Sequence, residues 1–521
     1  MKRFSLTIMF LLIFGLSFFL RAYGAFSNYP FWVDEFSTAN QAKYILKYGI
    51  NVFNNPDIYF ETHNITTHSL VALFFKIFGQ HEWVARLPFV IVGSFVPLLV
   101  FYLAEKMFNK TTAVSASLLT TFSYFMIVWS RQARGYVLLQ LLVLLTIFFY
   151  LKLLENRGSI VIATSIIISS LLGILTHSMF YILFIALVAD FIFYHREILQ
   201  VWLKSPWSYL LIVSLLVIIY KIGFLSNLIG TYYLGVLKAN NLWYYHSFLW
   251  REYGLITFLS IVGIILGMIK KKYLVTPIVF YIVFQLIFIS FLFHPYVLRY
   301  LLPIFPFLFI FAGYAITHIS NLILQRYQLN KYKFLSETIP ILIVLFIIIN
   351  GYKFVNKPKR FYSVNHDFRE IALIDYHQVY NIIKQKGDLK KGETAVIDTW
   401  WDRLYWYLGQ DYKPAYAFRW QSDPGLINGL PRFTPLIINS AGEKIIPQSN
   451  NVQLISNLSD FKKAMNSYSK GFIFIDDSSL PHDVIAFVEK NLKKEIYLDH
   501  YPLDDNPYSI WPATLYSWGI N

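Results

Sequence analysis

The chain has 521 residues, of which 56% are hydrophobic, 19% aromatic and only 14% charged. Soluble domains carry about 25% charged residues, so this composition excludes a single soluble core. It also excludes disorder over most of the chain, because disordered segments are poor in apolar residues. The formal charge of +15 is explained by basic cytoplasmic loops of a membrane protein, and we expect no nucleic-acid partner.

Long apolar stretches fill the first two thirds of the sequence. A membrane-spanning helix needs roughly 17–25 mostly apolar residues. We therefore predict a polytopic α-helical membrane domain over residues 1–351, with an uncleaved first span. The eleven predicted spans are 4–20, 86–107, 112–130, 136–154, 159–175, 177–194, 207–223, 252–269, 273–293, 297–318 and 337–351.

The basic residues predict an orientation for these spans. With the N-terminus inside, the inner segments hold 14 Lys and Arg, and the longer outer segments before residue 352 hold 11. This difference in density satisfies the positive-inside rule. The long first loop, 21–85, and the tail after residue 351 then face the extracytoplasmic side of the plasma membrane.

The first loop and the tail carry their own structural signals. In the loop, residues 36–48 have an amphipathic helical pattern, and 69–79 form an apolar helix too short to span. The tail, 352–521, has 20 Lys and Arg against 19 Asp and Glu, a soluble composition. Short β-rich runs between helical patterns predict a small extracytoplasmic α/β domain. The runs are 394–399, 435–439, 451–455 and 471–476, and the helical patterns are 367–386 and 481–493.

Two adjacent acids, Asp34 and Glu35, follow the first span in the sequence FWVDEFSTA. A carboxylate held just outside the membrane can deprotonate an acceptor hydroxyl or bind a divalent cation. The alternative is a structural role, because acids stabilise the start of a helix. Position alone leaves both interpretations open.

Two histidines, His63 and His68, stand five residues apart in ETHNITTHSL. Together with nearby acids they permit a metal site, but their spacing matches no zinc motif. The alternative is a pair of ordinary surface histidines.

Four arginines lie at the outer ends of the predicted spans. They are Arg86, Arg131, Arg134 and Arg299. Arginine near hydrocarbon is costly and is usually paired or functional. Snorkelling or pairing with acids would explain the four, and so would an anionic ligand, since guanidinium binds phosphate through two hydrogen bonds. His177 faces the same side, either as a helix-end cap or as a site residue.

Several stretches in order resemble the GT-C glycosyltransferases of the protein O-mannosyltransferase type, which include the lipid A aminoarabinose transferases. They are VDEFSTANQA, HNITTHSLVALFFKIFGQHEWVARLPFVIVG, SRQARGY at 130–136, THSMF at 176–180 and LRYLLPIFP at 298–306. The resemblance covers about residues 1–320. Two departures stand out: Asn64 and Ile65 replace the family's prolines, and Gln132 replaces a glutamate.

This resemblance implies transfer of a sugar, with inversion, from a polyprenyl-phosphate-linked donor to a hydroxyl of a lipid, glycan or protein acceptor. Asp34 would be the catalytic base and Glu35 its support. The donor's phosphate would be bound by residues of the matching motifs, namely His63, Arg86, Arg131, Arg134, Tyr136, His177, Arg299 and Tyr300. Metal dependence differs between branches of the superfamily, so a divalent cation stays open, with Glu35 and His63 as candidate ligands.

Two other classes of function compete with the enzyme. A lipid-linked-sugar transporter or flippase should place ionisable groups near the middle of the membrane. Here the polar candidates are few: Asp190, Lys221 and Gln285. A non-enzymatic membrane scaffold leaves the outer arginines unexplained. No nucleotide-binding or nucleophile-elbow motif occurs in the sequence.

Overall fold

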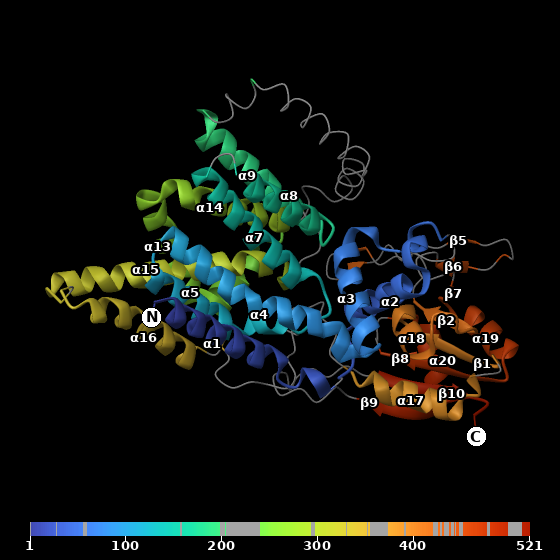
Figure 1. Cartoon of the computed structure of the whole chain (residues 1–521). Coiled ribbons are helices and arrows are strands. Elements are labelled where there is room, and N and C mark those ends of the chain that lie inside the picture. Colours follow the sequence, from blue (N-terminus) through green and yellow to red (C-terminus); the bar gives the residue numbers. More distant parts are fainter. Residues whose placement is uncertain are drawn as a thin grey trace. The chain divides into compact units, whose positions relative to one another are not determined.

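The structure is a computed structural model of the whole chain (Figure 1). It divides into two compact units, which are described separately. Unit 1 comprises residues 1–21, 89–131 and 135–358, and unit 2 comprises 22–88, 132–134 and 359–521. The structure describes residues 2–520 except 28, 56–59, 157–158, 198–203, 205–239, 293–296, 330, 352, 355–373, 390–391, 420–425, 428–429, 432–436, 439–441, 443, 447–451, 477–479 and 499–512.

Unit 1 is built from long apolar helices. Their bounds are α1 (Lys2–Ala22), α4 (Glu82–Met107), α5 (Lys110–Phe122), α6 (Tyr124–Ser130), α7 (Tyr136–Glu155), α8 (Ile160–Ile174), α9 (Phe180–Tyr194), α13 (Leu242–Lys270), α14 (Lys272–Ile287), α15 (Phe305–Arg326) and α16 (Lys333–Asn350). A π-helical turn, Phe288–Leu292, extends α14, and a 3₁₀ helix, Leu298–Ile304, precedes α15.

Seven helical segments of the described chain are long and apolar enough to cross a membrane. They correspond to predicted spans 4–20, 86–107, 136–154, 252–269, 273–293, 297–318 and 337–351. Helices α8 and α9, at the predicted spans 159–175 and 177–194, have 15 residues each. The predicted span 207–223 lies outside the described residues. The protein is therefore a multi-pass membrane protein, and the total of eleven spans stays a prediction.

The predicted span 112–130 is interrupted at Ser123. This residue has an extended backbone (φ −60°, ψ 120°), and its hydroxyl lies 3.1 Å from that of Tyr253. The segment after α16 crosses here, because Phe354 forms a β-bridge with Ser123 and Lys353 O accepts a bond from the amide of Tyr124. These cross-links replace helical hydrogen bonds, so two helices, α5 and α6, stand where hydropathy predicts one.

Unit 2 begins with the first long loop, and that loop is largely helical. It contains α2 (Val33–Tyr48), three short 3₁₀ helices and α3 (Ile65–Phe78). Both helices were predicted, although α3 starts four residues before the predicted 69. The 3₁₀ helices are Ala25–Ser27, Gly49–Phe53 and Thr62–Asn64.

The C-terminal part of unit 2 is a mixed α/β domain. An eight-stranded sheet has the order β5-β6-β7-β2-β1-β8-β10-β9, with β7, β2, β1 and β8 parallel. The strands are β1 (Thr394–Asp398), β2 (Ala415–Phe418), β5 (Ile437–Ile438), β6 (Lys444–Ile446), β7 (Val452–Ile455), β8 (Lys470–Ile475), β9 (Lys493–Leu498) and β10 (Ala513–Trp518). A separate ribbon pairs β3 (Leu426–Ile427) with β4 (Leu430–Pro431).

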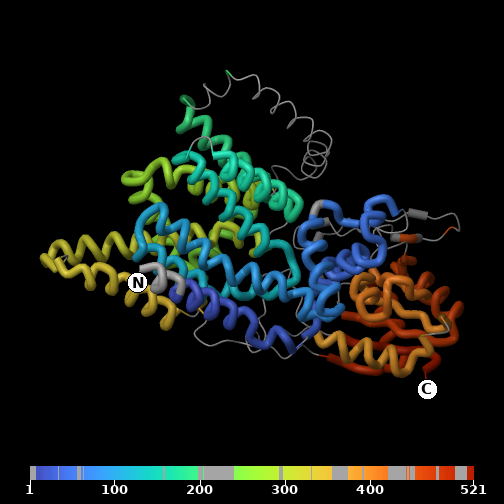
Figure 2. The backbone as a smooth tube through the Cα atoms, viewed as in Figure 1, coloured from blue at the N-terminus to red at the C-terminus, as the bar shows by residue number. Residues whose placement is uncertain are grey.

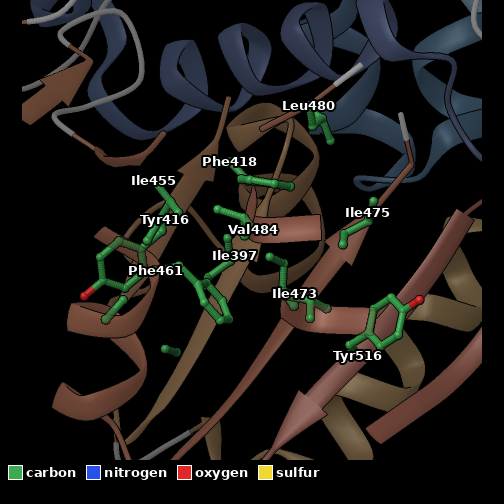
Figure 3. Close-up of a cluster of buried hydrophobic side chains, with 13 residues drawn as sticks. Ile397, Tyr416, Phe418, Ile455, Phe461, Ile473, Ile475, Leu480, Val484 and Tyr516 are labelled. Atoms are coloured by element: carbon green, nitrogen blue, oxygen red, sulfur yellow. The ribbon is translucent and has the colours of Figure 1, made fainter. Parts of the chain in front are cut away.

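Helices cover both faces of this sheet. They are α17 (Tyr376–Lys386), α18 (Trp401–Leu408), α19 (Leu458–Ser467) and α20 (His482–Asn491). Successive strand residues point to opposite faces. Ile473 faces the cluster that contains Phe461 of α19 and Val484 of α20 (Figure 3). Phe474 instead contacts Tyr376 of α17, on the other face.

A buried charge cluster connects α18 to the ends of β1 and β8. Arg403 donates to Asp398 (Nε–Oδ2 3.0 Å) and to Asp476 (Nη1–Oδ2 2.7 Å), and it is fully buried. Thr399 donates to Asp476, and Tyr380 of α17 donates to Asp398. The carboxyl ends of neighbouring parallel strands are where open α/β sheets usually bind ligands. Here the side chain of Arg403 occupies that position, so its role is to fix α18 on the sheet.

Replacing Arg403 by Leu tests this role. The change leaves the carboxylates of Asp398 and Asp476 buried without their cation, which typically costs about 3–5 kcal/mol. We expect the thermal midpoint of the purified protein to fall by about 5 °C or more. Lys490→Ala, at an exposed position of α20, is the control and should change the midpoint little. Equal melting of both variants would contradict the assignment.

Candidate active site on helix α2

The first turn of α2 separates the two adjacent acids. Trp32, just before the helix, is extended (φ −73°, ψ 153°), and its amide donates to Glu35 Oε2 at 2.9 Å. Glu35 therefore performs the capping role that was the alternative interpretation of the acidic pair, consistent with the preference for acids at helix starts. Asp34 takes no part in this cap.

Glu35 also forms a buried ion pair with Arg86. Arg86 Nε and Nη2 donate to the two carboxylate oxygens at 2.8 and 2.7 Å. The remaining bonds of the guanidinium go to the carbonyl oxygens of Tyr29 (2.7 Å) and Pro30 (2.9 Å). The amide of Ala133 donates to Glu35 Oε1 at 2.7 Å. Both charged side chains are fully buried, so the pair joins three separate chain segments.

Asp34 keeps a partly exposed carboxylate. Its side chain is 31% exposed, and its Oδ2 lies 4.0 Å from Arg134 Nη2. Arg134 also donates to the backbone oxygen of Asp34 (3.1 Å) and to the hydroxyl of Thr38 (3.2 Å). Of the two acids, Asp34 is the one with an accessible oxygen for chemistry.

Polar residues continue from Asp34 along one face of α2. Residues three, four or seven positions apart lie on the same face of a helix. Ser37 stands three positions and Gln41 seven positions after Asp34, so all three share a face of α2. Both contact Glu61: Ser37 Oγ donates to Glu61 Oε1 (3.3 Å), and Glu61 N donates to Gln41 Oε1 (3.1 Å). His68, fully buried in α3, lies 4.0 Å from Glu61. Glu61 was not among the predicted site residues, although it stands two positions before His63.

His63 lies in the 3₁₀ helix Thr62–Asn64. Its side chain is outside the described residues, so its part in the site stays a prediction from the family resemblance.

Asp402 is an acid of the tail that sequence reasoning did not single out. It lies in the first turn of α18, and its carbonyl oxygen accepts a 2.6 Å bond from Asn40 of α2, 362 residues away. Burial, reinforced by the negative charges of Glu61 and Asp34, raises the pKa of Asp402 to about 7, and Arg134 opposes the shift. The composition of the tail carried no signal for this, because Asp402 becomes unusual only through its neighbours.

Further contacts attach the first loop to the C-terminal domain. Glu82 Oε1 accepts from His377 Nε2 (2.8 Å) and from Trp406 Nε1 (3.0 Å). Lys43 of α2 donates to the carbonyl oxygen of Trp406 and lies 3.8 Å from the centre of its ring. Burial lowers the pKa of Lys43 to about 8. In Figure 2 the blue segment that contains α2 accordingly lies against the orange segment that contains α18.

A second group of predicted residues comes together in unit 1. Arg299 Nε donates to the hydroxyl of Tyr136 at 3.1 Å, and its guanidinium lies 5.8 Å from the ring of Trp129. The ring of Tyr136 lies 5.2 Å from His177 and 6.1 Å from Tyr300. His177 Nδ1 accepts from the amide of Met179, so the predicted helix-end cap is present as well. The guanidinium of Arg299 therefore lies in a group of aromatic rings that also includes the imidazole of His177.

Arg131 lies at the end of α6. It follows α6 as the C-cap residue and is buried. Its proposed contact with phosphate stays a prediction.

The described residues do not fit a resident metal ion. No group of three or more His, Asp and Glu in that part of the chain is arranged to hold one. Both oxygens of Glu35, a candidate ligand, accept bonds from Arg86 and backbone amides.

The comparisons with known proteins agree with this architecture. ArnT from Cupriavidus metallidurans bound to undecaprenyl phosphate superposes with a TM-score of 0.55 at 12% identity, over 98% of each chain. Its apo state gives 0.56 at 11% identity, over 99% of this chain and 98% of that one. The Archaeoglobus fulgidus oligosaccharyltransferase tethered to an acceptor peptide gives 0.54 at 12%, covering 91% of this chain and 69% of the other. No curated protein matches by sequence.

At such identities the likeness shows the fold, so the chain is a multi-pass membrane protein with the architecture of ArnT. Residues 63–223 match the profile of the dolichyl-phosphate-mannose-protein mannosyltransferases. This segment is similar to that family, which confirms the resemblance seen in the motifs. The segment includes Arg86, Arg134 and Tyr136, whereas Asp34 and Arg299 lie outside it.

Removing the negative charge of Glu35 tests whether its ion pair with Arg86 has a structural role. In Glu35→Gln the guanidinium of Arg86 stays buried without a counterion, which typically costs about 3–5 kcal/mol. We expect a large fall in the melting temperature. Glu489→Gln, at an exposed position of α20, is the matched control and should melt like the unaltered protein. A Glu35→Gln variant that melts unchanged would show that the pair is not structural.

Proposed function

We propose that this protein is an integral-membrane glycosyltransferase. It transfers a sugar from a polyprenyl-phosphate-linked donor to a hydroxyl group of a lipid, glycan or protein acceptor. The observation that carries the proposal is Asp34, a partly exposed carboxylate held beside Arg134 by a helix whose start is fixed by a buried ion pair. The family match supports it, as do folds solved with undecaprenyl phosphate and with dolichol-phosphate.

Asp34 acts as the general base. Its carboxylate removes the proton from the acceptor hydroxyl while the acceptor oxygen bonds to the anomeric carbon of the sugar. The bond from that carbon to the phosphate oxygen breaks, and its electrons leave with the lipid phosphate. Attack from the face opposite the phosphate inverts the anomeric centre. A positioned base of this kind contributes about 10²–10⁴-fold to the rate.

The Arg299 group of unit 1 binds the donor's phosphate. Phosphate departure is favoured by fixed positive charge and oriented donors. Arg299 supplies the charge, Tyr136 and Tyr300 supply aromatic walls, and His177 adds an imidazole. Arg131 and Arg134 contribute further positive charge, and we keep His63 as a donor-binding residue on the resemblance alone.

Glu35 and Arg86 have a positioning role in this proposal. Both are buried, and protein atoms already occupy the two Glu35 oxygens and every nitrogen of Arg86. Their function is to hold the first turn of α2 so that the adjacent carboxylate is presented in one orientation. Direct binding of phosphate by Arg86 would require breaking this buried pair.

The intramembrane polar residues give no support to the transporter alternative. Asp190 accepts bonds from Tyr150 (2.7 Å) and Thr276 (2.5 Å), so it joins α7, α9 and α14. Gln285 donates to the carbonyl oxygen of Tyr300 at 2.9 Å. These are helix-to-helix bonds of the kind that stabilise membrane bundles. Lys221 lies outside the described residues.

We also propose that the first loop and the C-terminal tail face the extracytoplasmic side of the membrane. The segments on the opposite side of the membrane carry the higher density of Lys and Arg, and by the positive-inside rule this supports placing them in the cytoplasm. This orientation puts Asp34 and Asp402 on the face of the plasma membrane away from the cytoplasm.

The Asp34→Asn variant tests the catalytic base. Purified protein in proteoliposomes would receive radiolabelled polyprenyl-phosphate mannose or glucose, with a membrane extract of the source cells as acceptor. We expect kcat to fall by about 10²–10⁴-fold, with a smaller effect on KM, because the lost group acts mainly in the transition state.

Asp411→Asn is the matched control. Asp411 is 84% exposed and pairs with Lys47, away from the polar face of α2. It should transfer sugar at the unaltered rate. Equal rates for Asp34→Asn and the unaltered protein would overturn the assignment of the base.

The absence of cysteine makes the orientation directly testable. We would introduce a single cysteine at Asp411, in the tail, or at Lys333, the first residue of α16, whose side chain is 89% exposed. A membrane-impermeant maleimide should label Asp411→Cys in intact cells and Lys333→Cys only after permeabilisation. The opposite pattern would reverse the orientation.

A further inference from the structure

The 3₁₀ helix that precedes α15 carries Arg299, and two of its backbone carbonyl groups stand before prolines. Tyr300 is three positions before Pro303, and Leu302 is four positions before Pro306. Three and four positions are the distances at which 3₁₀ and α-helical hydrogen bonds form, and proline has no N–H to donate. Each of these carbonyl groups therefore lacks one of the donors that a helix usually supplies.

Two glutamines from other helices donate to these carbonyl oxygens. Gln285 of α14 places its Nε2 2.9 Å from the oxygen of Tyr300, and Nε2 of Gln140 in α7 donates to the oxygen of Leu302. A carbonyl oxygen only accepts hydrogen bonds, so these contacts fix which end of each side-chain amide faces the 3₁₀ helix. Both glutamine side chains are fully buried. The 3₁₀ helix is thereby tied to α7 and to α14.

The amide of Gln285 also contacts the turn that carries His177. Its Nε2 lies 3.6 Å from the sulfur of Met179, and the backbone amide of Met179 donates to His177 Nδ1 at 3.1 Å. A thioether sulfur is a weak acceptor, so this contact contributes orientation more than binding energy. Gln285 therefore joins two members of the group around Arg299, namely Tyr300 and His177.

Gln140 makes the matching contacts from α7. Its Nε2 lies 3.4 Å from the sulfur of Met126, and Met126 is three positions before Trp129 in α6. Gln140 also stands four positions after Tyr136, so these two residues share a face of α7. The rings of Trp129 and Tyr136 lie 5.8 and 5.5 Å from the guanidinium of Arg299. Gln140 is thus connected to both aromatic rings beside the guanidinium.

The two glutamine amides contribute geometry more than stability. The Oε1 atoms of Gln140 and Gln285 are buried and have no hydrogen-bond partner in the described part of the chain. Burying an unpaired amide oxygen costs free energy, which offsets the gain from the bonds that the N–H groups make. The main consequence of the pair is that the 3₁₀ helix can take only one rotation and one height relative to α7 and α14.

We propose that Gln140 and Gln285 are positioning residues that set the direction of Arg299 toward the phosphate of the lipid-linked donor. This inference rests on the proposed function. Because both glutamines are fully buried, they act through the 3₁₀ helix and not by contact with the donor. A guanidinium binds phosphate through hydrogen bonds of defined direction, so a small rotation of the 3₁₀ helix is enough to weaken binding.

Gln140→Met and Gln285→Met test the proposal, because methionine keeps the length of the side chain and removes its N–H groups. We would measure the binding of radiolabelled undecaprenyl phosphate to the purified protein. The dissociation constant should rise by about tenfold in each variant, which is the size of one hydrogen bond to a charged group. The matched control is Thr146→Val, which removes a buried bond to Ser169 (2.8 Å) from the same helix α7. It should bind the lipid like the unaltered protein.

A double-mutant cycle with Arg299 separates positioning from a general loss of structure. In the Arg299→Ala background, Gln285→Met should leave the dissociation constant unchanged, because the group that Gln285 positions is already missing. A merely structural effect would weaken binding by the same factor in both backgrounds. Additive effects would therefore overturn the proposal.

Pro303→Ala separates a folding defect from the loss of the tie to α14. It restores an N–H three positions after Tyr300, so the carbonyl group regains a donor within the 3₁₀ helix, but α14 stays unconnected. The double variant Gln285→Met/Pro303→Ala should melt at or above the temperature of Gln285→Met and should still bind the lipid weakly. Affinity restored to that of the unaltered protein would overturn the role of the tie.

The outcomes distinguish this inference from the proposed function. If both methionine variants bind undecaprenyl phosphate as tightly as the unaltered protein while Arg299→Ala binds it weakly, the positioning role is wrong and the proposed donor site stands. If Arg299→Ala binds the lipid as tightly as the unaltered protein, the proposed donor site is wrong, and the positioning role is overturned with it.

Discussion

The buried pair of Glu35 and Arg86 is the interaction on which the candidate site depends. It replaces hydration of two full charges by six short hydrogen bonds, counting those to Tyr29, Pro30, Trp32 and Ala133. A buried pair of this kind adds little stability over a hydrophobic contact but strongly penalises any arrangement that separates it. Its effect is therefore geometrical, since α2 can begin in only one place relative to α4 and the 132–134 turn.

The same constraint separates the roles of neighbouring acids. Asp34 and Glu35 are adjacent in sequence and equal in chemistry, but successive residues on a helix point about 100° apart. One side chain is directed into the buried pair, and the other is directed toward Arg134 and the polar face of α2. A functional carboxylate and a structural one thus arise from a single helical turn.

The C-terminal domain is an integral part of this arrangement. Arg403 fills the place at the strand ends where an α/β sheet would usually bind a ligand, and α18 is held there with its outer side toward α2. Asn40, Lys43 and Glu82 each bond to residues of this domain. We infer that the domain supports the first loop, which gives a physical role to a segment that composition identified only as soluble.

Much of the fold follows from local sequence. The helices of the first loop and four of the strands were predicted near their observed positions, because amphipathic and β-rich patterns depend on neighbours in sequence. The break at Ser123 was not predicted, since the cause is a crossing segment more than two hundred residues away. Strands β2, β3, β4, β6, β9 and β10 were not predicted. Four of these six have only two to four residues, which is too short for a β-rich run to stand out in the sequence.

For the site, sequence determined the membrane class, the resemblance to a glycosyltransferase family and the residue types available: acids after the first span and arginines at span ends. These depend on hydropathy and on ordered motifs, which are properties of the chain itself. Tertiary structure decided which acid is accessible, that Arg86 pairs with Glu35, and that Glu61 bonds to Ser37 and Gln41 of α2. Such outcomes depend on burial and on charges brought together by folding, because the energy of a charge is set by its surroundings and not by its position in the sequence.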